Sequence, residues 1–152
     1  MVKPADLTVQ SIALDADSLQ QGAASNGIAT IVENRLGDTN TAAAIIDSTK
    51  IVFRRNGSDV SSQFSVTPTI SPSTVPGGLS RTFNYSMDVL PSAELGWVKI
   101  YQELWYRDSN SDIQYHHLSS VVDSFYVKEH GVISITSIQP SQNTVTSGQD
   151  ST

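Results

Sequence analysis

The chain has 152 residues, of which 38% are hydrophobic and 16% charged, and its net charge is −6. This length suits one domain and little more. Nine Lys and Arg residues, scattered along an acidic chain, argue against binding to nucleic acid or to anionic lipid, because both need clustered positive charge. The sequence contains no cysteine, which excludes disulfides and thiolate metal sites.

No apolar run is long enough for a membrane-spanning helix, so we expect no membrane insertion in this segment. No apolar stretch follows Met1–Pro4 either, and these residues do not begin a signal peptide. The polar, strand-like sequence favours an extracellular or cell-surface protein. Its signal and anchor would then lie outside this chain.

The first half of the chain reads as short strands joined by turns. Residues 7–12 alternate apolar and polar side chains, with a slip of one at Ser11. Asn56-Gly57 is a strong signal for a two-residue hairpin turn. The loop at 68–78 is rich in Pro and Gly. The strands expected around it cover about residues 7–12, 27–32, 49–54 and 60–66.

The second half predicts longer strands. Residues 79–90 carry apolar side chains with period two, which is typical of a half-buried antiparallel strand. Residues 97–106 have apolar side chains in both alternating sets, which predicts a central strand covered on both faces. A strand over 113–127 is expected to break near Ser119-Ser120. The whole pattern predicts an all-β, immunoglobulin-like sandwich of about seven or eight antiparallel strands.

The two ends of the chain resemble each other. Residues 7–25 align without a gap to residues 133–151, and both segments begin with a strand pattern. We therefore expect a sandwich over residues 5–127, a linker over 128–131, and the first strand of a following repeat, or a flexible tail, over 132–152. The identical pairs are Ser11 with Ser137, Ile12 with Ile138, Gly22 with Gly148, and Ser25 with Ser151.

The order of these features resembles the cell-adhesion-related immunoglobulin-like domains of bacteria and archaea, the CARDB group. The matching positions are Asp6-Leu7, Gly22, Asn34 with Gly37, and Gly96. Two residues separate Asn34 from Gly37, where the family usually has one. The resemblance implies a stalk or adhesion role in a large surface protein, and it brings no catalytic residues.

Two short segments contain residues of the types that bind metal ions. Asp108, Asn110 and Asp112 place oxygen ligands at alternate positions, as a Ca²⁺ loop requires, although the later Gly and Glu of an EF-hand are absent. A hairpin turn is the alternative, since Asp, Asn and Ser also cap backbone groups in turns. His116 and His117 are adjacent on a strand and would face opposite sides, so we predict no metal site there. We therefore expect no cofactor, with Ca²⁺ at residues 108–112 as the alternative.

Trp97, Tyr101 and Trp105 recur every fourth residue and would share one side of their strand. Aromatic rings on a sheet face can stack against sugar rings, so these residues could form a glycan platform. Packing in the core and across strands is the alternative. Exposure of the three rings separates the two interpretations.

No nucleophile elbow, phosphate loop or dinucleotide fingerprint occurs in the sequence. We therefore expect no enzymatic activity. The favoured function is a structural or adhesion module, a spacer repeat from a larger cell-surface or secreted protein. Its partners would be neighbouring repeats of the same chain, and a cell-surface protein or glycan. The alternative is a carbohydrate-binding accessory module that uses the aromatic sheet face.

Overall fold

The computed structural model describes residues 1–68, 73–120 and 122–130. These residues form eleven strands and one short 3-10 helix, Ser61–Gln63. The segment 132–152, expected to begin a second repeat, lies outside the described residues.

The first sheet has four strands in the order β1-β3-β8-β6. All three of its pairings are antiparallel. The register of β1 against β3 shifts between Val9 and Ser11, so the slip seen in the sequence is a β-bulge. The strands are β1 (Leu7–Leu14), β3 (Asn26–Asn34), β6 (Phe64–Pro68) and β8 (Ser80–Val89).

The second sheet is built around the long strand β9 (Gly96–Asp108), which pairs with β4 (Ala44–Arg55) along one edge. The opposite edge of β9 pairs first with β11 (Asp123–Lys128) and then with β10 (Gln114–Leu118). The predicted break near Ser119 is therefore confirmed. Three shorter strands complete the sheet, namely β2 (Ser18–Gln20), β5 (Ser58–Asp59) and β7 (Ser73–Val75).

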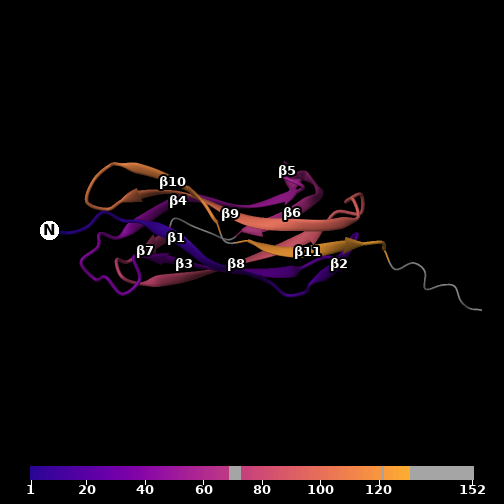
Figure 1. Ribbon diagram of the computed structural model, residues 1–152, viewed down its shortest axis with the longest axis horizontal. Coiled ribbons are helices and arrows are strands. Elements are labelled where there is room, and N and C mark those ends of the chain that lie inside the picture. Colours follow the sequence, from indigo (N-terminus) through magenta and orange to yellow (C-terminus); the bar gives the residue numbers. More distant parts are fainter. Residues whose placement is uncertain (69–72, 121, 131–152) are drawn as a thin grey trace, which may run out of the picture.

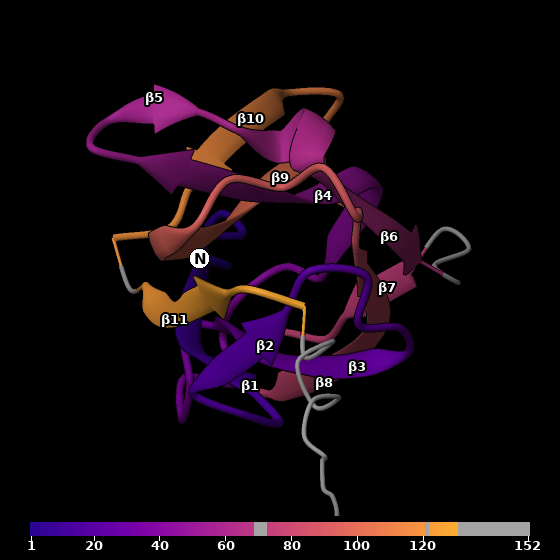
Figure 2. The same cartoon turned by 90° about the vertical axis from the view of Figure 1, so that its right-hand side faces the viewer.

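The two sheets pack face to face (Figure 2). Their strand orders, β1-β3-β8-β6 and β2-β11-β9-β4-β5, follow the immunoglobulin pattern of two packed antiparallel sheets. The protein is an all-β sandwich. One expectation is corrected, because β2 pairs with β11 in parallel. The chain passes from β1 into the other sheet without reversing, so β2 meets β11 running in the same direction; a three-residue strand gives too little pattern to be recognised in the sequence.

The core lies between the sheets and is filled by alternate residues of each strand. Three phenylalanines form its largest aromatic group. Phe53 stacks on Phe64 with ring centroids 4.4 Å apart, and Phe125 meets Phe64 edge-on at 5.6 Å. Phe53 and Phe125 are almost fully buried. Such a cluster joins strands of both sheets, since Phe64 belongs to the first sheet and the other two to the second.

A polar link also crosses the core. The Gln102 side chain of β9 is fully buried, and its Nε2 donates to Tyr85 Oη of β8 at 2.9 Å and to Thr49 Oγ1 of β4 at 3.1 Å. Many antibody domains join their sheets at this level by a disulfide. This chain has no cysteine, and a single hydrogen bond from Gln102 to Tyr85 connects the two sheets here.

Asn34 organises the pole of the sandwich where β3 ends. It is fully buried, and its Nδ2 donates to the carbonyls of Ala42 at 2.9 Å and Val75 at 3.0 Å. Its Oδ1 accepts the N–H of Asp6 at 3.0 Å. One side chain therefore satisfies three backbone groups from three separate segments, which are otherwise costly to bury.

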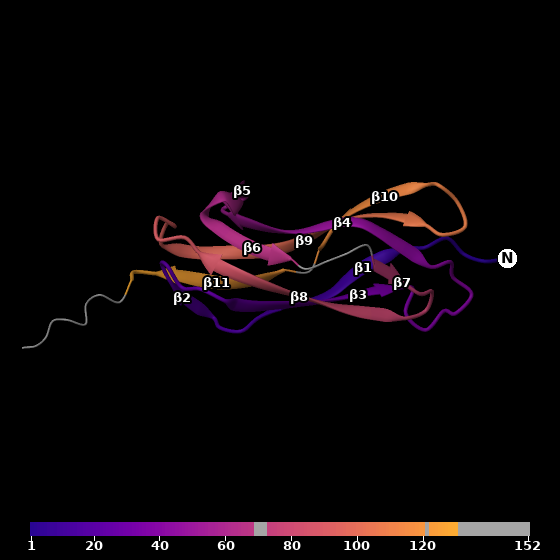
Figure 3. The same ribbon diagram turned by 180° about the vertical axis from the view of Figure 1, so that it is seen from behind.

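The sandwich is elongated, and the chain enters at one pole and leaves β11 at the opposite pole (Figures 1 and 3). Met1 and the start of β1 lie at the pole organised by Asn34. Lys128, which the sequence placed in the linker, is the last residue of β11, and its carbonyl accepts the N–H of Gln21 at 3.0 Å. None of the helical structure in the described residues is long and apolar enough to cross a membrane.

Candidate functional site: the outer face of the second sheet

The side chains of β9 alternate between the core and solvent. Val98, Ile100, Gln102 and Leu104 are buried, whereas Trp97 is 61% exposed and Tyr101 and Trp105 are half-buried on the outer side of the sheet. The expectation that β9 is covered on both faces is therefore wrong. The strand is central in its sheet, but no element of the described residues lies over its outer face, because these residues form only two layers.

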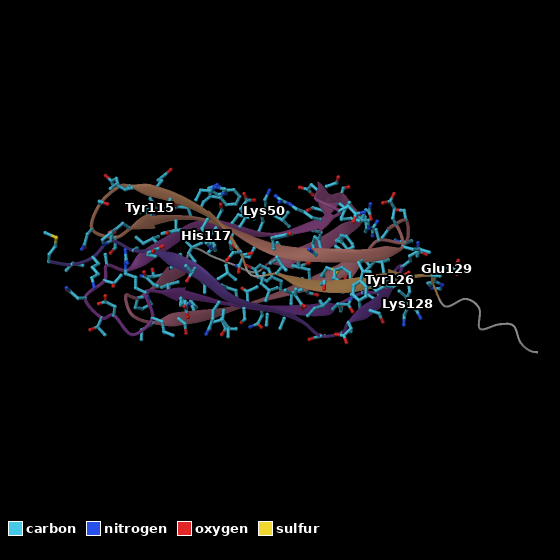
Figure 4. The ribbon with its side chains drawn as sticks, viewed as in Figure 1. Lys50, Tyr115, His117, Tyr126, Lys128 and Glu129 are labelled. Atoms are coloured by element: carbon cyan, nitrogen blue, oxygen red, sulfur yellow. The ribbon has the colours of Figure 1, made fainter. Side chains whose placement is uncertain are left out.

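We call Trp97, Tyr101, Trp105 and Tyr126 the outer aromatic face. Tyr126 of β11 lies opposite Trp97 in the register, and the two rings meet edge-on with centroids 5.5 Å apart. Figure 4 shows Tyr126 near the pole where β11 ends. Trp97 and Trp105 are eight residues apart on one strand, roughly 26 Å. The face is therefore long enough to contact several sugar rings at once.

Polar side chains surround Trp105 and contact one another. Its ring stacks on His116 at 5.1 Å, and Lys50 Nζ lies 5.7 Å from the ring centroid. Both partners contact Glu103: His116 Nε2 lies 2.6 Å from Oε2, and Lys50 Nζ 3.6 Å from Oε1. A hollow of about 430 Å³ lies beside Trp105. It is lined by Asp47, Ser48, Trp105, Tyr106, Gln114, Tyr115 and His116.

A second hollow, of about 300 Å³, lies between Trp97 and Tyr101. The guanidinium of Arg54 covers the Tyr101 ring at 5.1 Å. The lining residues are Arg54, Asn56, Gly57, Trp97, Lys99 and Tyr101, and none of them is acidic. Asn56 and Gly57 both have positive φ, as a two-residue hairpin turn requires, so the predicted turn forms one wall of this hollow.

The segment over 108–112, for which the sequence left a calcium loop and a hairpin turn as alternatives, forms a hairpin turn in the structure. Asp108 is buried, and both of its carboxylate oxygens accept backbone N–H groups, Oδ2 from Ala5 at 2.8 Å and Oδ1 from Asn110 at 2.7 Å. Asn110 and Asp112 are exposed. The carboxylate of Asp108 therefore caps the turn and holds the N-terminal segment. Nowhere in the described residues do three histidine or acidic side chains gather closely enough to hold a metal ion.

The two adjacent histidines lie on opposite sides of β10. His116 pairs with Trp105 on the outer face, whereas His117 pairs with Leu104. Burial lowers the pKa of His117 below its ordinary value, and the neighbouring His116 lowers it further, while Asp6 acts in the opposite direction. This placement agrees with the alternation predicted for the strand.

Several residues of this face were not identified from the sequence. Lys50 and Arg54 come from β4, and their positions beside Trp105 and Tyr101 depend on the register between β4 and β9. A single sequence does not reveal that register. Tyr126 could have been found, because Phe125 and Val127 on either side of it are apolar and predict an outward position for Tyr126.

No family model matches the sequence, and no curated protein matches it either. Among solved structures, the chain is similar to a FixG-related protein from Vibrio parahaemolyticus, with 17% identity over 84% of this chain and 99% of that one and a TM-score of 0.43. It is also similar to a protein from Archaeoglobus fulgidus, with 13% identity over 80% and 98% of the two chains and a TM-score of 0.43. A family 123 glycoside hydrolase from Clostridium perfringens gives 7% identity, 83% and 27% coverage, and a TM-score of 0.40.

Proposed function

We propose that this domain is a non-enzymatic structural or adhesion module, a spacer in a larger cell-surface or secreted protein. The observation that carries the proposal is that Met1 and the end of β11 at Lys128 lie at opposite poles of an elongated sandwich (Figure 1). The ends of a compact domain more often lie close together. Opposite ends suit a module that adds its full length to a linear array, with neighbouring repeats as its partners. With thirteen residues in β9, that length is roughly 40 Å.

The pairing of β2 with β11 supports the same role. These strands are parallel, with Ser18, Leu19 and Gln20 opposite Tyr126, Val127 and Lys128. Two further backbone bonds extend the contact: Tyr126 N–H donates to Asp17 at 2.9 Å, and Gln21 N–H donates to Lys128 at 3.0 Å. Tension applied at the two poles would slide β2 and β11 past each other, so these bonds would bear the load together rather than one at a time.

The resemblance to CARDB domains supports a place in a surface protein. Of the positions that carry it, Asn34 is the buried junction described above, and Gly22, Gly37 and Gly96 all have positive φ. These motif residues thus have structural roles in this chain, as we would expect in a member of that family.

Single-molecule force measurements test the spacer. The chain is pulled from its two ends, and, in a control, from its C-terminal end and a handle at Ala24→Cys near the β2–β3 turn. Because the chain has no native cysteine, the handle is unique. We expect one cooperative unfolding event at clearly higher force when the ends are pulled. Equal forces in the two geometries, or gradual extension at low force, would contradict a load-bearing spacer.

One observation favours carbohydrate binding as a second candidate function. Trp97 is 61% exposed and lines a hollow. Large exposed aromatic residues that gather in one patch usually mark a binding surface. A glycan array probed with the chain and with Trp97→Ala tests this candidate. Binding that disappears in the variant supports it, and an absence of binding to every glycan would reject it.

A further inference from the structure

The two hollows on the outer face differ in their charge. Beside Trp105, Lys50 and His116 contact Glu103, and Arg107 Nε contacts both oxygens of Asp47 at 2.9 and 3.0 Å. The hollow between Trp97 and Tyr101 has no such compensation. Neither Arg54 nor Lys99 forms an ion pair with any described residue.

Arg54 and Lys99 are moreover direct cross-strand partners in the register of β4 and β9. Both line the hollow. Like charges directly opposite each other destabilise a sheet. Here they occur in a chain with a net charge of −6 and only nine Lys and Arg residues. The concentration of unpaired cations in this one hollow is therefore not a general property of the surface.

One carboxylate, that of Asp59 on β5, lies opposite Arg54 in the register of β4 and β5. Its Oδ1 accepts the N–H of Ser61 at 2.8 Å. This backbone hydrogen bond is the main reason for its lowered pKa, and Arg54 contributes least. Asp59 is thus occupied by its own turn and is not among the residues that line the hollow.

The remaining lining groups define the chemistry of a ligand. Trp97 and Tyr101 offer ring faces for the apolar side of a sugar, and Asn56 offers an amide for hydroxyl groups. Arg54 and Lys99 offer donors that match a carboxylate, which arginine can bind in a bidentate manner. A neutral sugar would use the aromatic rings and leave the two cations unpaired.

We propose that the hollow bounded by Arg54, Trp97, Lys99 and Tyr101 binds a carboxylate-bearing sugar unit of an acidic glycan. The proposal rests on the carbohydrate-binding candidate and specifies its ligand class. Uronic acids and sialic acids share the chemistry that the hollow recognises.

Matched probes test the charge. The chain in a Trp105→Phe background, in which Trp97 is the only tryptophan, is titrated with a galacturonic acid oligomer and with its methyl ester, and with sialyllactose and lactose. Tryptophan fluorescence reports binding. We expect each acid to bind at least about tenfold more tightly than its neutral counterpart, because charge-assisted hydrogen bonds are stronger than neutral ones. The acid that binds more tightly shows whether the carboxylate belongs to a uronic acid or to a sialic acid.

Variants test the location. Arg54→Gln and Lys99→Gln are expected to weaken binding of the acid about tenfold each. Lys128→Gln removes a charge of the same sign outside the hollow and should leave binding unchanged. Thermal melting serves as a folding control. Lys99→Gln should not melt earlier, because it removes a repulsive contact, whereas Arg54→Gln also loses the contact of Arg54 with the Tyr101 ring and should melt only slightly earlier.

The outcomes separate the two proposals. Equal binding of acid and methyl ester overturns the acidic ligand and leaves carbohydrate binding standing. Acid binding that survives both Arg54→Gln and Lys99→Gln overturns the site. No binding of any probe overturns the acidic ligand as well, and the glycan array then decides whether carbohydrate binding fails with it.

Discussion

The two outer faces of the sandwich are built from the same kind of outward strand positions and yet differ in composition. The described outward residues of β1, β3, β6 and β8 include no aromatic side chain. Small or polar residues dominate that face, among them Thr8, Ala29, Ser65, Thr67, Thr82, Asn84 and Ser86. The outer face of β9 and β11 carries two tryptophans and two tyrosines.

The difference teaches that this fold does not need exposed aromatic residues. One sheet of the sandwich is covered by small polar side chains, which is the ordinary solution for a half-buried antiparallel sheet. The aromatic residues of the other face therefore call for an explanation outside folding. We therefore expect substitutions on the inner side of β9 to lower stability and substitutions on its outer side to weaken ligand binding.

The largest expected effect lies on the inner side of β9. Ile100→Ala removes a fully buried side chain and should lower the free energy of unfolding by about 4 kcal/mol. Its neighbour Tyr101 faces outward, and Tyr101→Ala should cost about 1 kcal/mol or less, mainly through its contact with Arg54. Urea denaturation measures both. If Tyr101→Ala lowers the free energy of unfolding as much as Ile100→Ala does, the aromatic face stabilises the fold by packing. That result would contradict the proposed difference between the two sides of β9.

A somewhat smaller effect is expected at the pole. Asn34→Ala leaves the N–H of Asp6 and the carbonyls of Ala42 and Val75 without their partner, and should cost about 3 kcal/mol. Asn84→Ala, the same substitution on the polar outer face, should cost under about 0.5 kcal/mol. Denaturant midpoints for the pair check this. Similar losses in the free energy of unfolding for Asn34→Ala and Asn84→Ala would contradict the role of Asn34 in holding three backbone segments together.

The polar link between the sheets should contribute less. Tyr85→Phe removes the phenol that accepts from Gln102 Nε2 and should cost about 1 kcal/mol. Gln102 Oε1 is buried without a hydrogen-bond partner, so Gln102→Leu should be close to neutral. In the double variant neither member of the Gln102–Tyr85 hydrogen bond is left without the other, and the half-buried Thr49 Oγ1 alone loses its partners, so the cost should fall below the sum of the single costs. Strict additivity in this cycle would show that the two side chains act independently.

The smallest effect concerns pH. Because burial lowers the pKa of His117 below 6.5, the unfolded chain takes up the proton more readily than the folded one. Stability should therefore decrease as the pH falls through 6.5 toward 5. His117→Gln should flatten that part of the Tm profile by less than about 3 °C. The matched control is the same substitution at an exposed histidine, His130→Gln. If the Tm of His117→Gln falls with pH as steeply as that of the parent chain, His117 is not the group responsible for the pH dependence.

Much of the fold could be predicted because strand signals are local. The alternation around Phe83 and Tyr85, the slip at Ser11 and the Asn56-Gly57 turn each correspond to a feature of the structure. The parallel pairing of β2 with β11 could not be predicted in this way. It joins residues more than a hundred positions apart, and β2 has only three residues.

The site was predicted only in part, for a related reason. Trp97, Tyr101 and Trp105 share a face because they belong to one strand, and period two is enough to show it. Whether that face looks toward the core or toward solvent depends on what the neighbouring strands bury. The pairing of Arg54 with Lys99 depends on the register of two distant strands, which includes a shift between Ile46 and Ser48.

The short strands at the borders of the sheets have a consequence for behaviour at high concentration. The second sheet is bordered by β2, β5, β7 and β10, which have three, two, three and five residues, and β6 of the first sheet ends at Pro68. Long, flat borders with unpaired backbone groups are the usual starting points of aggregation between like domains. With borders this short, and with the bulge in β1, copies of the domain crowded side by side would have little backbone to share. The shortness of β2, which prevents its prediction from the sequence, would thus also help crowded copies to remain monomeric.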